Sequence, residues 1–351
     1  MTSQEETLLT ESLDRQAAQA PDDRDLLNTV RSRLRRRRSG RAAGSLVLAC
    51  AAVATGIFGV HSVLGPGVTA GPDVAPATQI SPGPTPTEGW RWESYRTIQL
   101  QVPSDWTYGT TDRPACMVQK KEPPYVGRPG MVPSIGCQSW VLGPAVRSPY
   151  LWFASSRLVG SQDAGDGWVE ETREFDNVKV TVFAGDAAQR RRIFDTVTPI
   201  VSVDGNGCPP VVPIAAPRTG NPLATVGAVR SISVCSYGAQ VLTASSTLPA
   251  DRARSTVAAI LAAPRGGGPN KPECTDFSPV DVLLLVKGSK HDAEVTIRYS
   301  QCTDNGTFDG TTTRRLARSY LEPLLTGAHA LAGWTGESGL GLINYSPAKS
   351  K

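Results

Sequence analysis

Seven arginines between Arg31 and Arg41 run directly into residues 42–64, which contain no Asp, Glu, Lys or Arg. A helix needs roughly 20 apolar residues to cross a bilayer, and a basic flank stays on the cytoplasmic side. The junction therefore predicts a cytoplasmic helical tail over residues 1–41, a transmembrane helix over 42–64 and an extracytoplasmic remainder. The residues that determine this topology are Arg31, Arg33, Arg35, Arg36, Arg37, Arg38 and Arg41.

Two other interpretations of the junction stay open. A cleaved signal peptide would use the small residues Val68-Thr69-Ala70 as its processing site, although the region before the apolar stretch is longer than a normal signal has. A lipoprotein signal would end at Cys50, after Val47-Leu48-Ala49. A soluble mature protein that starts near Gly71 would overturn the anchor, which we favour and which gives a single-pass protein of the cell membrane.

Cysteine use agrees with the predicted compartments. One cysteine, Cys50, lies in the predicted span, and the other six lie beyond it: Cys116, Cys137, Cys208, Cys235, Cys274 and Cys302. An even number on the oxidising side indicates three disulfides. We expect neighbours to pair, as Cys116–Cys137, Cys208–Cys235 and Cys274–Cys302. No CxxC pair is present and the three histidines are scattered, so we predict neither a metal site nor a cofactor.

The extracytoplasmic part divides into two modules of the α+β class. A Pro/Gly-rich linker occupies residues 65–89, the first module 90–205, the second 206–335 and a C-terminal tail 336–351. In the first module, 97–103, 151–156 and 177–185 predict strands, 109–147 a long stapled loop and 187–200 a helix. In the second, strands over 228–237, 239–248, 280–288 and 293–302 and helices over 250–263 and 313–325 predict a four-stranded ββαββα antiparallel sheet with both helices on one face.

Several short strings carry a resemblance. They are the run Trp90–Tyr95, Val102-Pro103 with Trp106, Val126–Gly130 before Gly136-Cys137, Val234–Tyr237, Ala263-Pro264 with Gly266–Pro269, and Val295–Tyr299 before Cys302. Over residues 90 to 335 the chain resembles a set of uncharacterised actinobacterial single-pass membrane proteins with a cysteine-containing extracytoplasmic region. Residues 1–41 resemble the tails of membrane proteins paired with extracytoplasmic-function sigma factors. That resemblance implies a sigma factor as cytoplasmic partner, without zinc, because no His or Cys precedes Cys50.

The sequence holds no catalytic motif, so we do not expect an enzyme. The acidic residues Asp163, Asp166, Glu170 and Glu171 are typical of solvated loops unless they converge as a glycosidase pair. The tryptophans of the first module would form either a carbohydrate or peptide platform or part of the core. They are Trp90, Trp92, Trp106, Trp140 and Trp152. The segment Cys302–Gly310 resembles a calcium loop, but its Asn-Gly and Asp-Gly pairs favour turns.

These observations predict a membrane-anchored envelope protein whose extracytoplasmic modules bind or sense a ligand, with signalling through the cytoplasmic tail as a hypothesis. Net charge is only +4 for 351 residues, and the arginine cluster supplies much of it. The near-neutral outer part argues against a nucleic-acid partner. A structural or envelope-maintenance protein with an inert tail is the alternative, and an extracytoplasmic hydrolase is a third class that no motif supports.

Overall fold

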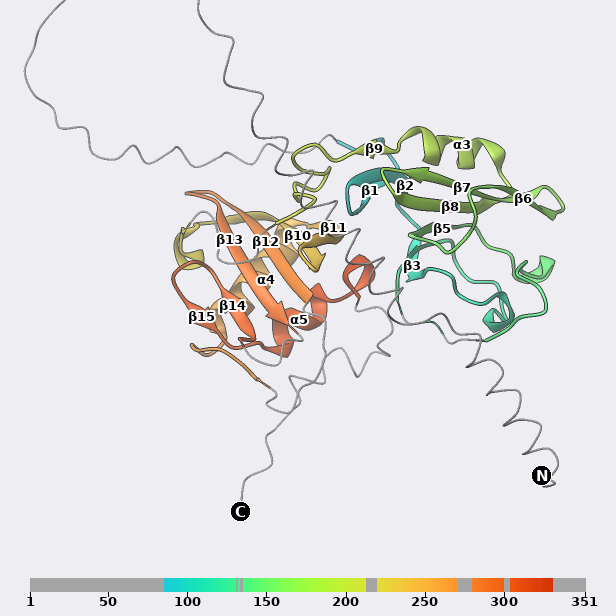
Figure 1. Ribbon diagram of the computed structural model, residues 1–351. Coiled ribbons are helices and arrows are strands. Elements are labelled where there is room, and N and C mark those ends of the chain that lie inside the picture. The colour runs from blue at the N-terminus through green and yellow to red at the C-terminus, as the bar shows by residue number, and fades with distance from the viewer. Residues whose placement is uncertain are drawn as a thin grey trace, which may run out of the picture. The chain divides into compact units, whose positions relative to one another are not determined.

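The computed structural model describes residues 85–130, 132, 135–212, 220–270, 280–299 and 304–330. The chain divides into two units, Met1–Val74 and Ala75–Lys351, and every described residue lies in the second. The fold is of the mixed α+β class, with many strands and few helices (Figure 1). None of the helices in these ranges is long and apolar enough to span a bilayer. The predicted span 42–64 and the seven arginines lie outside the described residues.

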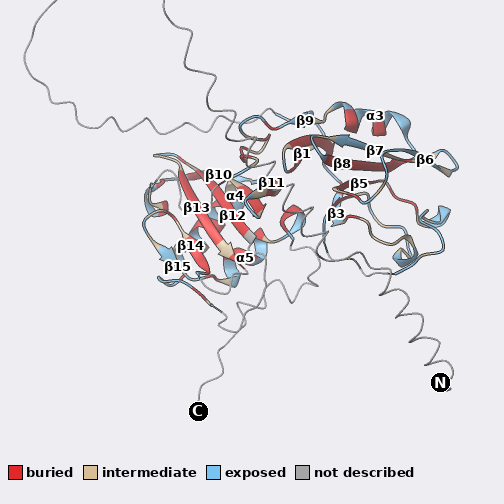
Figure 2. Ribbon diagram, in the orientation of Figure 1, coloured by how far each residue is buried: buried red, intermediate tan, exposed pale blue. Residues whose placement is uncertain are grey.

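A six-stranded sheet carries the first half of the described chain. Its order is β3 (Thr107–Thr110), β4 (Tyr125–Arg128), β5 (Tyr150–Phe153), β8 (Val178–Ala184), β7 (Trp168–Phe175) and β6 (Gly160–Gly165). The strands β3, β4 and β5 run parallel, and the remaining pairs run antiparallel. Burial is concentrated in β5 and β8, whereas β6 is mostly exposed at the edge (Figure 2).

A helix and a small second sheet cover one face of these strands. The small sheet consists of β1 (Trp90–Tyr95), β2 (Ile98–Pro103) and β9 (Thr198–Pro199). The helix α3 (Ala187–Asp195) begins at Asp186, whose carboxylate accepts from the amides of Ala188 and Gln189, a normal N-cap. It buries Ile193 and Phe194 in a core with Leu100, Leu151 and Val180. The apolar residues on this face of the sheet are therefore packed against the helix and the small sheet.

The second half of the chain forms another six-stranded sheet, antiparallel throughout. Its order is β11 (Val241–Leu248), β10 (Val229–Gly238), β12 (Val280–Gly288), β13 (Ala293–Tyr299), β14 (Gly306–Phe308) and β15 (Thr313–Arg314). The helices α4 (Ala250–Ala262) and α5 (Arg318–Leu324) contribute to the same hydrophobic core as alternate residues of β10, β12 and β13. Both helices therefore lie on one face of this sheet. Its other face buries Cys235 and Leu283 in a smaller cluster.

The four predicted strands of this sheet and the helix over 250–263 are present, but the prediction of four strands in all was wrong, because β14 and β15 extend the sheet to six. Residues 313–314 form strand β15, and α5 begins only at Arg318. The prediction of a single helix over 313–325 was wrong because a turn at Asp309 and Gly310 folds Thr313 back onto Phe308. The Asp309 carboxylate fixes this turn, since it accepts from the amides of Thr311 and Thr312.

The first sheet also contains strands that the sequence did not predict. Strand β4 lies inside 109–147, which we expected to be a loop, and β6 and β7 form an unpredicted hairpin. Likewise, the helix predicted over 187–200 ends at Asp195, because Thr198 and Pro199 pair with β2.

Two of the three predicted disulfides are confirmed. Cys116 pairs with Cys137 and Cys208 pairs with Cys235, each with 5.7 Å between the Cα atoms. The predicted Cys274–Cys302 pair lies outside the described residues. Cys208 and Cys235 are fully buried, whereas Cys116 is exposed. The two bonds therefore differ in their access to solvent.

Candidate binding pocket

The first sheet has a second apolar face, which no α-helix of the described residues covers. Strand alternation directs Leu151 and Phe153 of β5 into the core beneath α3 and turns Tyr150 and Trp152 to the opposite side. There the Tyr150 ring stacks on Trp152, with 4.1 Å between centroids, and on Phe183 at 4.9 Å. Trp168 continues the row beside Phe183, also at 4.9 Å. We call these aromatic residues, together with Tyr125, the aromatic face.

Two glycines make room for the largest rings. A Cβ atom at Gly127 would lie 2.4 Å from Cδ1 of Trp152, and one at Gly109 would lie 2.6 Å from Cδ2 of Tyr125. Real Cβ atoms do not approach so closely, so both rings depend on a missing side chain in the neighbouring strand. Trp152 then donates a hydrogen bond of 3.0 Å from Nε1 to the hydroxyl of Tyr125.

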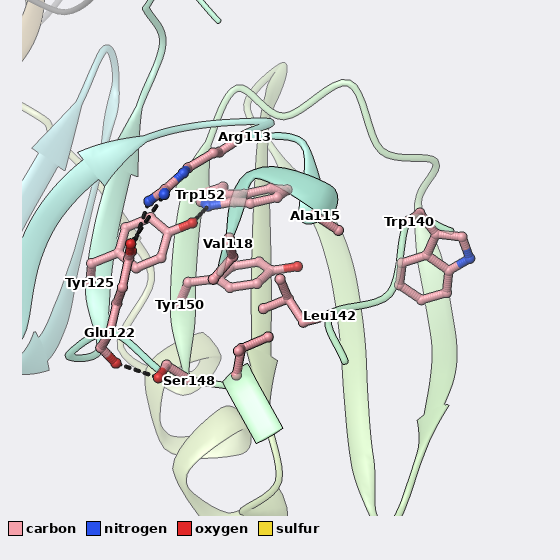
Figure 3. Close-up of a pocket in the computed structure, with 11 residues that line it drawn as sticks. Arg113, Ala115, Val118, Glu122, Tyr125, Trp140, Leu142, Ser148, Tyr150 and Trp152 are labelled. Carbon is pink, nitrogen blue, oxygen red and sulfur yellow. Dashed lines mark hydrogen bonds and ion pairs between the residues drawn. The ribbon is translucent and has the colours of Figure 1, made fainter. Parts of the chain in front are cut away.

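A narrow pocket opens between the aromatic face and the chain segments before and after β4 that cover it (Figure 3). We call these two segments together the covering loop. Tyr125, Tyr150 and Trp152 form its base, and Val118, Leu142 and Val146 are among the apolar residues around them. Its volume is about 20 Å³, which is room for one small group such as the terminal methyl of an alkyl chain. We call this pocket the slot.

An ion pair and a serine mark the polar edge of the slot. Arg113 donates to both carboxylate oxygens of Glu122, over 2.7 and 3.1 Å. The hydroxyl of Ser148 donates to the backbone carbonyl of Glu122 and so fixes the loop against the start of β5 (Figure 3). Bidentate pairs of this kind are geometrically specific, so the edge of the slot has a defined shape.

A buried carboxyl group lies behind the aromatic rings. Glu170 of β7 accepts a hydrogen bond from the hydroxyl of Tyr150 and lies 3.0 Å from Nε of Arg157. Burial raises the pKa of Glu170 above its ordinary value, although Tyr150 and Arg157 act in the opposite direction. Burial, followed by the charge of Glu170, raises the pKa of Tyr150 well above its ordinary value. Tyr150 is therefore a neutral hydrogen-bond donor here.

A wider hollow lies on the other side of Trp140. It has a volume of about 220 Å³ and shares Arg113, Ala115 and Trp140 with the slot. Arg157 also lines the hollow, with its guanidinium carbon 5.4 Å from the centroid of Trp140 and 5.6 Å from that of Trp152. These contacts are cation–π interactions. In Figure 3 the Trp140 side chain stands apart from the stacked rings, and it lines both the slot and the hollow.

The polar groups that line the hollow differ in how many of their atoms already have a hydrogen-bond or ion-pair partner. Both carboxylate oxygens of Asp112 are occupied, by the hydroxyl of Ser155 and the amide of Ser156, each at 2.8 Å. Arg157 forms its ion pair through Nε. Among the described residues nothing accepts a hydrogen bond from its Nη1 or Nη2. Those two nitrogens can therefore bind an oxyanion from the hollow.

The loop over the slot is held at two further places. The Cys116–Cys137 disulfide, with a sequence separation of 21, joins the segment before β4 to the segment after it. Arg147 is buried and donates to the carbonyl of Leu142, and to those of Ala164 and Gly165 in the β6–β7 hairpin. The two segments of the covering loop are thus joined to each other and to the sheet edge.

The acidic residues considered from the sequence do not converge. Glu170 is buried behind Tyr150, whereas Glu171 accepts from Arg173 and Asp166 from Arg147. Asp163 accepts from the amide of Gly165 within the hairpin. Each carboxylate has its own partner, so these residues do not form the pair that glycoside hydrolysis requires.

The tryptophans divide between core and surface. Trp106 is buried in the core beneath α3, with Trp90 packed against it, and Trp152 is buried on the aromatic face. Trp92 lies against Gly205, where a Cβ atom would be 2.2 Å from Cδ1 of the indole. Trp140 is exposed and borders both the slot and the hollow. The five tryptophans therefore do not form one platform, and Trp140 and Trp152 are the two that line the slot.

The calcium-like segment is a turn in its described part. Asp309 uses Oδ1 for Thr311 and Thr312 and Oδ2 for the amide of Leu223. These hydrogen bonds outweigh burial and lower the pKa of its carboxyl group. No cluster of metal-ligating side chains occurs among residues that the structure describes.

Sequence reasoning missed Tyr150, Arg157 and the partnership of Glu170 with both. The available signal was the uninterrupted apolar run Tyr150–Phe153, which is typical of a strand buried on both faces. Such a run requires something to cover the second face, and the loop before it is the nearest candidate in the chain. Glu170 lies two strands away in the sheet. No pattern in the sequence predicts that it contacts Tyr150 and Arg157.

Comparison of the chain with protein-family models, with curated proteins and with solved structures gives no match. The case for a function therefore depends on the residues around the slot and on the sequence.

Proposed function

We propose that this protein is a membrane-anchored, extracytoplasmic binding protein whose first module binds a small amphiphile beside Trp140. The slot takes the thin apolar end of the ligand, and the hollow takes an acidic group such as a phosphate or carboxylate. One observation carries the proposal: the slot and the hollow share Trp140 as a wall, and one is apolar while the other presents the terminal nitrogens of Arg157.

The apolar half of the proposal follows from how the aromatic face is covered. Helices and strands can exclude water from an apolar face by continuous packing, but here a loop leaves a channel against Tyr150 and Trp152. Displacing water from such a channel is favourable, by about 25 cal/mol for each Å² of apolar surface buried. An aromatic base with a few convergent polar groups is typical of small-molecule sites.

The acidic half follows from the charges that line the hollow. Arg157 is held by Glu170 behind it and by the rings of Trp140 and Trp152 beside it. It is therefore positioned before a ligand arrives, which reduces the ordering entropy that binding costs. Asp112 is the opposing charge in the hollow, and both of its oxygens are engaged with serines.

The membrane location is proposed from the sequence, and the disulfides support it. The arginine cluster before residues 42–64 favours a single span with the N-terminus in the cytoplasm. The confirmed Cys116–Cys137 and Cys208–Cys235 disulfides support an oxidising compartment for the modules. A sigma factor bound by residues 1–41 stays a hypothesis, which a pull-down with those residues would test.

Calorimetry with an anionic and a cationic amphiphile of the same chain length tests the binding function. The full chain in lipid nanodiscs would be titrated with octyl phosphate below its micelle concentration, with empty nanodiscs as the reference. We expect saturable binding that octyltrimethylammonium does not reproduce. Arg157→Gln should weaken binding at least tenfold, because one buried charge-assisted contact contributes about that much.

The matched control is Arg191→Gln, which makes the same change at an exposed position of α3. This variant should bind octyl phosphate as the parent does. Equal binding by the Arg157→Gln and Arg191→Gln variants, or heats no larger than those of empty nanodiscs, would contradict the proposed site.

A further inference from the structure

Exposed apolar side chains gather around the hollow. Seven large hydrophobic residues are exposed in the described chain, and five of them line the hollow or lie within two residues of its lining. These five are Met117, Ile135, Trp140, Leu158 and Val159. Leu158 is 77% exposed and Val159 57% exposed, directly after Arg157. We call the five residues the apolar rim. Such a concentration indicates a contact surface rather than scattered exposure.

Basic residues accompany the apolar rim. Lys120 and Lys121 are exposed on the covering loop, and in the described part of the chain neither has an ion-pair partner. Of the neighbouring acidic groups, Glu122 is paired with Arg113, whereas Asp112 accepts from two neutral serines and keeps its negative charge. The two lysines outnumber this one unpaired carboxylate, so they add positive charge beside the apolar and aromatic side chains.

We infer that the apolar rim docks onto the anionic surface of the membrane that carries the predicted span. This inference rests on the proposed anchor. Tryptophan partitions to the level of the lipid headgroups, exposed aliphatic residues enter the boundary of the acyl chains, and lysines are attracted by anionic lipids. The rim supplies the first two, as Trp140 and as Leu158 with Val159, and the exposed Lys120 and Lys121 supply the third.

The linker between the predicted span and the first module permits contact between the rim and the membrane, and it also favours that contact. The 25 residues from 65 to 89 separate the predicted span from strand β1, and a chain of that length reaches at most about 85 Å. The rim is therefore confined near its own membrane, where docking is an intramolecular event with a high effective concentration. Each contact between a rim residue and the lipids can then be weak, and the rim still docks.

Docking would place the hollow at the level of the lipid headgroups. The rim residues Ile135 and Trp140 line the hollow itself. A ligand with an acidic head and an apolar end could then pass from the bilayer surface to Arg157 and the slot without crossing bulk water. The membrane surface is thus the source from which the proposed ligand is taken.

Quenching by brominated lipids tests the docking directly. The full chain would be placed in nanodiscs of phosphatidylglycerol with brominated acyl chains, and in otherwise identical nanodiscs of phosphatidylcholine. The signal of Trp140 is the difference between the parent and the Trp140→Phe variant. We expect quenching of that signal in the anionic nanodiscs, reduced at least twofold in phosphatidylcholine or in high salt.

Two pairs of substitutions separate the rim from unspecific effects. Leu158→Ser with Val159→Ser should reduce the quenching at least twofold, as should Lys120→Glu with Lys121→Glu. The control pair is Val201→Ser with Val211→Ser, which changes the two exposed apolar residues outside the rim and should leave the quenching unchanged. Equal quenching of all variants, or none in the parent, would overturn the inference.

Self-association is the competing outcome. If sedimentation shows that the parent forms dimers that the Leu158→Ser, Val159→Ser variant loses, the rim binds a second copy and the inference is wrong. Failure of docking is distinguishable from failure of the proposed function, because Leu158 and Val159 line neither the slot nor the hollow. The variant with both serine substitutions should therefore still bind octyl phosphate.

Failure of the anchor is distinguishable as well. A chain without an anchor would not enter nanodiscs at all.

Discussion

At the scale of single residues, the slot depends on the absence of a side chain at position 127. Gly127→Ala would place Cβ 2.4 Å from Trp152, so we expect the ring to move and the base of the slot to deform. Overpacking of this kind costs about 1–3 kcal/mol, measurable by urea denaturation, and octyl phosphate binding should weaken. Gly136→Ala is the control, because no atom lies within 4 Å of its Cβ. Equal stability of both variants would contradict the packing described.

His329 gives the second prediction at the residue scale. Its Nδ1 lies 2.7 Å from the hydroxyl of Ser236 and its Nε2 lies 2.8 Å from that of Ser246. Burial, aided by the charge of Arg128, lowers the pKa of His329 to about 3. The unfolded chain binds this proton near pH 6.5 and the folded chain does not. The free energy of unfolding should therefore fall between pH 6.5 and 3, by up to about 1.4 kcal/mol per pH unit.

Denaturation midpoints across this pH range test the contribution of His329. A His329→Gln variant keeps a donor and an acceptor between the two serines but does not titrate. Its free energy of unfolding should decline less steeply on acidification than that of the parent. Parallel curves for the two proteins would show that His329 does not titrate as described.

At the scale of elements, the two disulfides should differ in reactivity. Cys116 is exposed on the covering loop, whereas Cys208 and Cys235 are fully buried. We expect mild reductant followed by alkylation to modify Cys116 and Cys137 first, as read by mass spectrometry. Loss of this cross-link should cost about 3 kcal/mol in the chain-entropy model and weaken octyl phosphate binding. Simultaneous modification of Cys208 and Cys235 would contradict the difference in access.

Elements were predictable from the sequence where burial dominates their pattern. The strands β10, β12 and β13 and the helix α4 follow from apolar periodicity and from Pro249 at the helix start. Strand β6 is mostly exposed, with the polar sequence GSQDAG, so it has no apolar signal. Strand β4 lies among prolines and glycines that favour turns, and it exists because β3 and β5 pair with it on either side.

At the scale of the whole molecule, the chain is proposed to place its modules on one side of a membrane and its tail on the other. Protease treatment of sealed, inside-out vesicles should remove the N-terminal tail and leave the remainder protected. The extracytoplasmic modules should be digested only after the vesicles are opened. Digestion of the modules in sealed inside-out vesicles, or recovery of a soluble chain starting near Gly71, would contradict the anchor.

The sequence predicted the pairing of four cysteines correctly, but it did not predict the site. The slot depends on Tyr150, Trp152 and Val118, which become neighbours only when the covering loop folds onto β5. Arg157 acquires its partner Glu170 through the β5–β8–β7 strand order. Long-range contacts of this kind leave no periodic pattern in one sequence, so the structure was needed to find them.

Photolabelling tests the binding function most directly, because it reports where the ligand lies. The full chain in nanodiscs would be irradiated with octyl phosphate that carries a diazirine at the end of its alkyl chain, and the labelled residues would be mapped by mass spectrometry. The account predicts labelling concentrated at Val118, Leu142 and Val146, suppressed by excess octyl phosphate and lost in the Arg157→Gln variant. Labelling of the exposed residues Val201 and Val211 as strong as that of the slot, or labelling that excess octyl phosphate does not suppress, would contradict it.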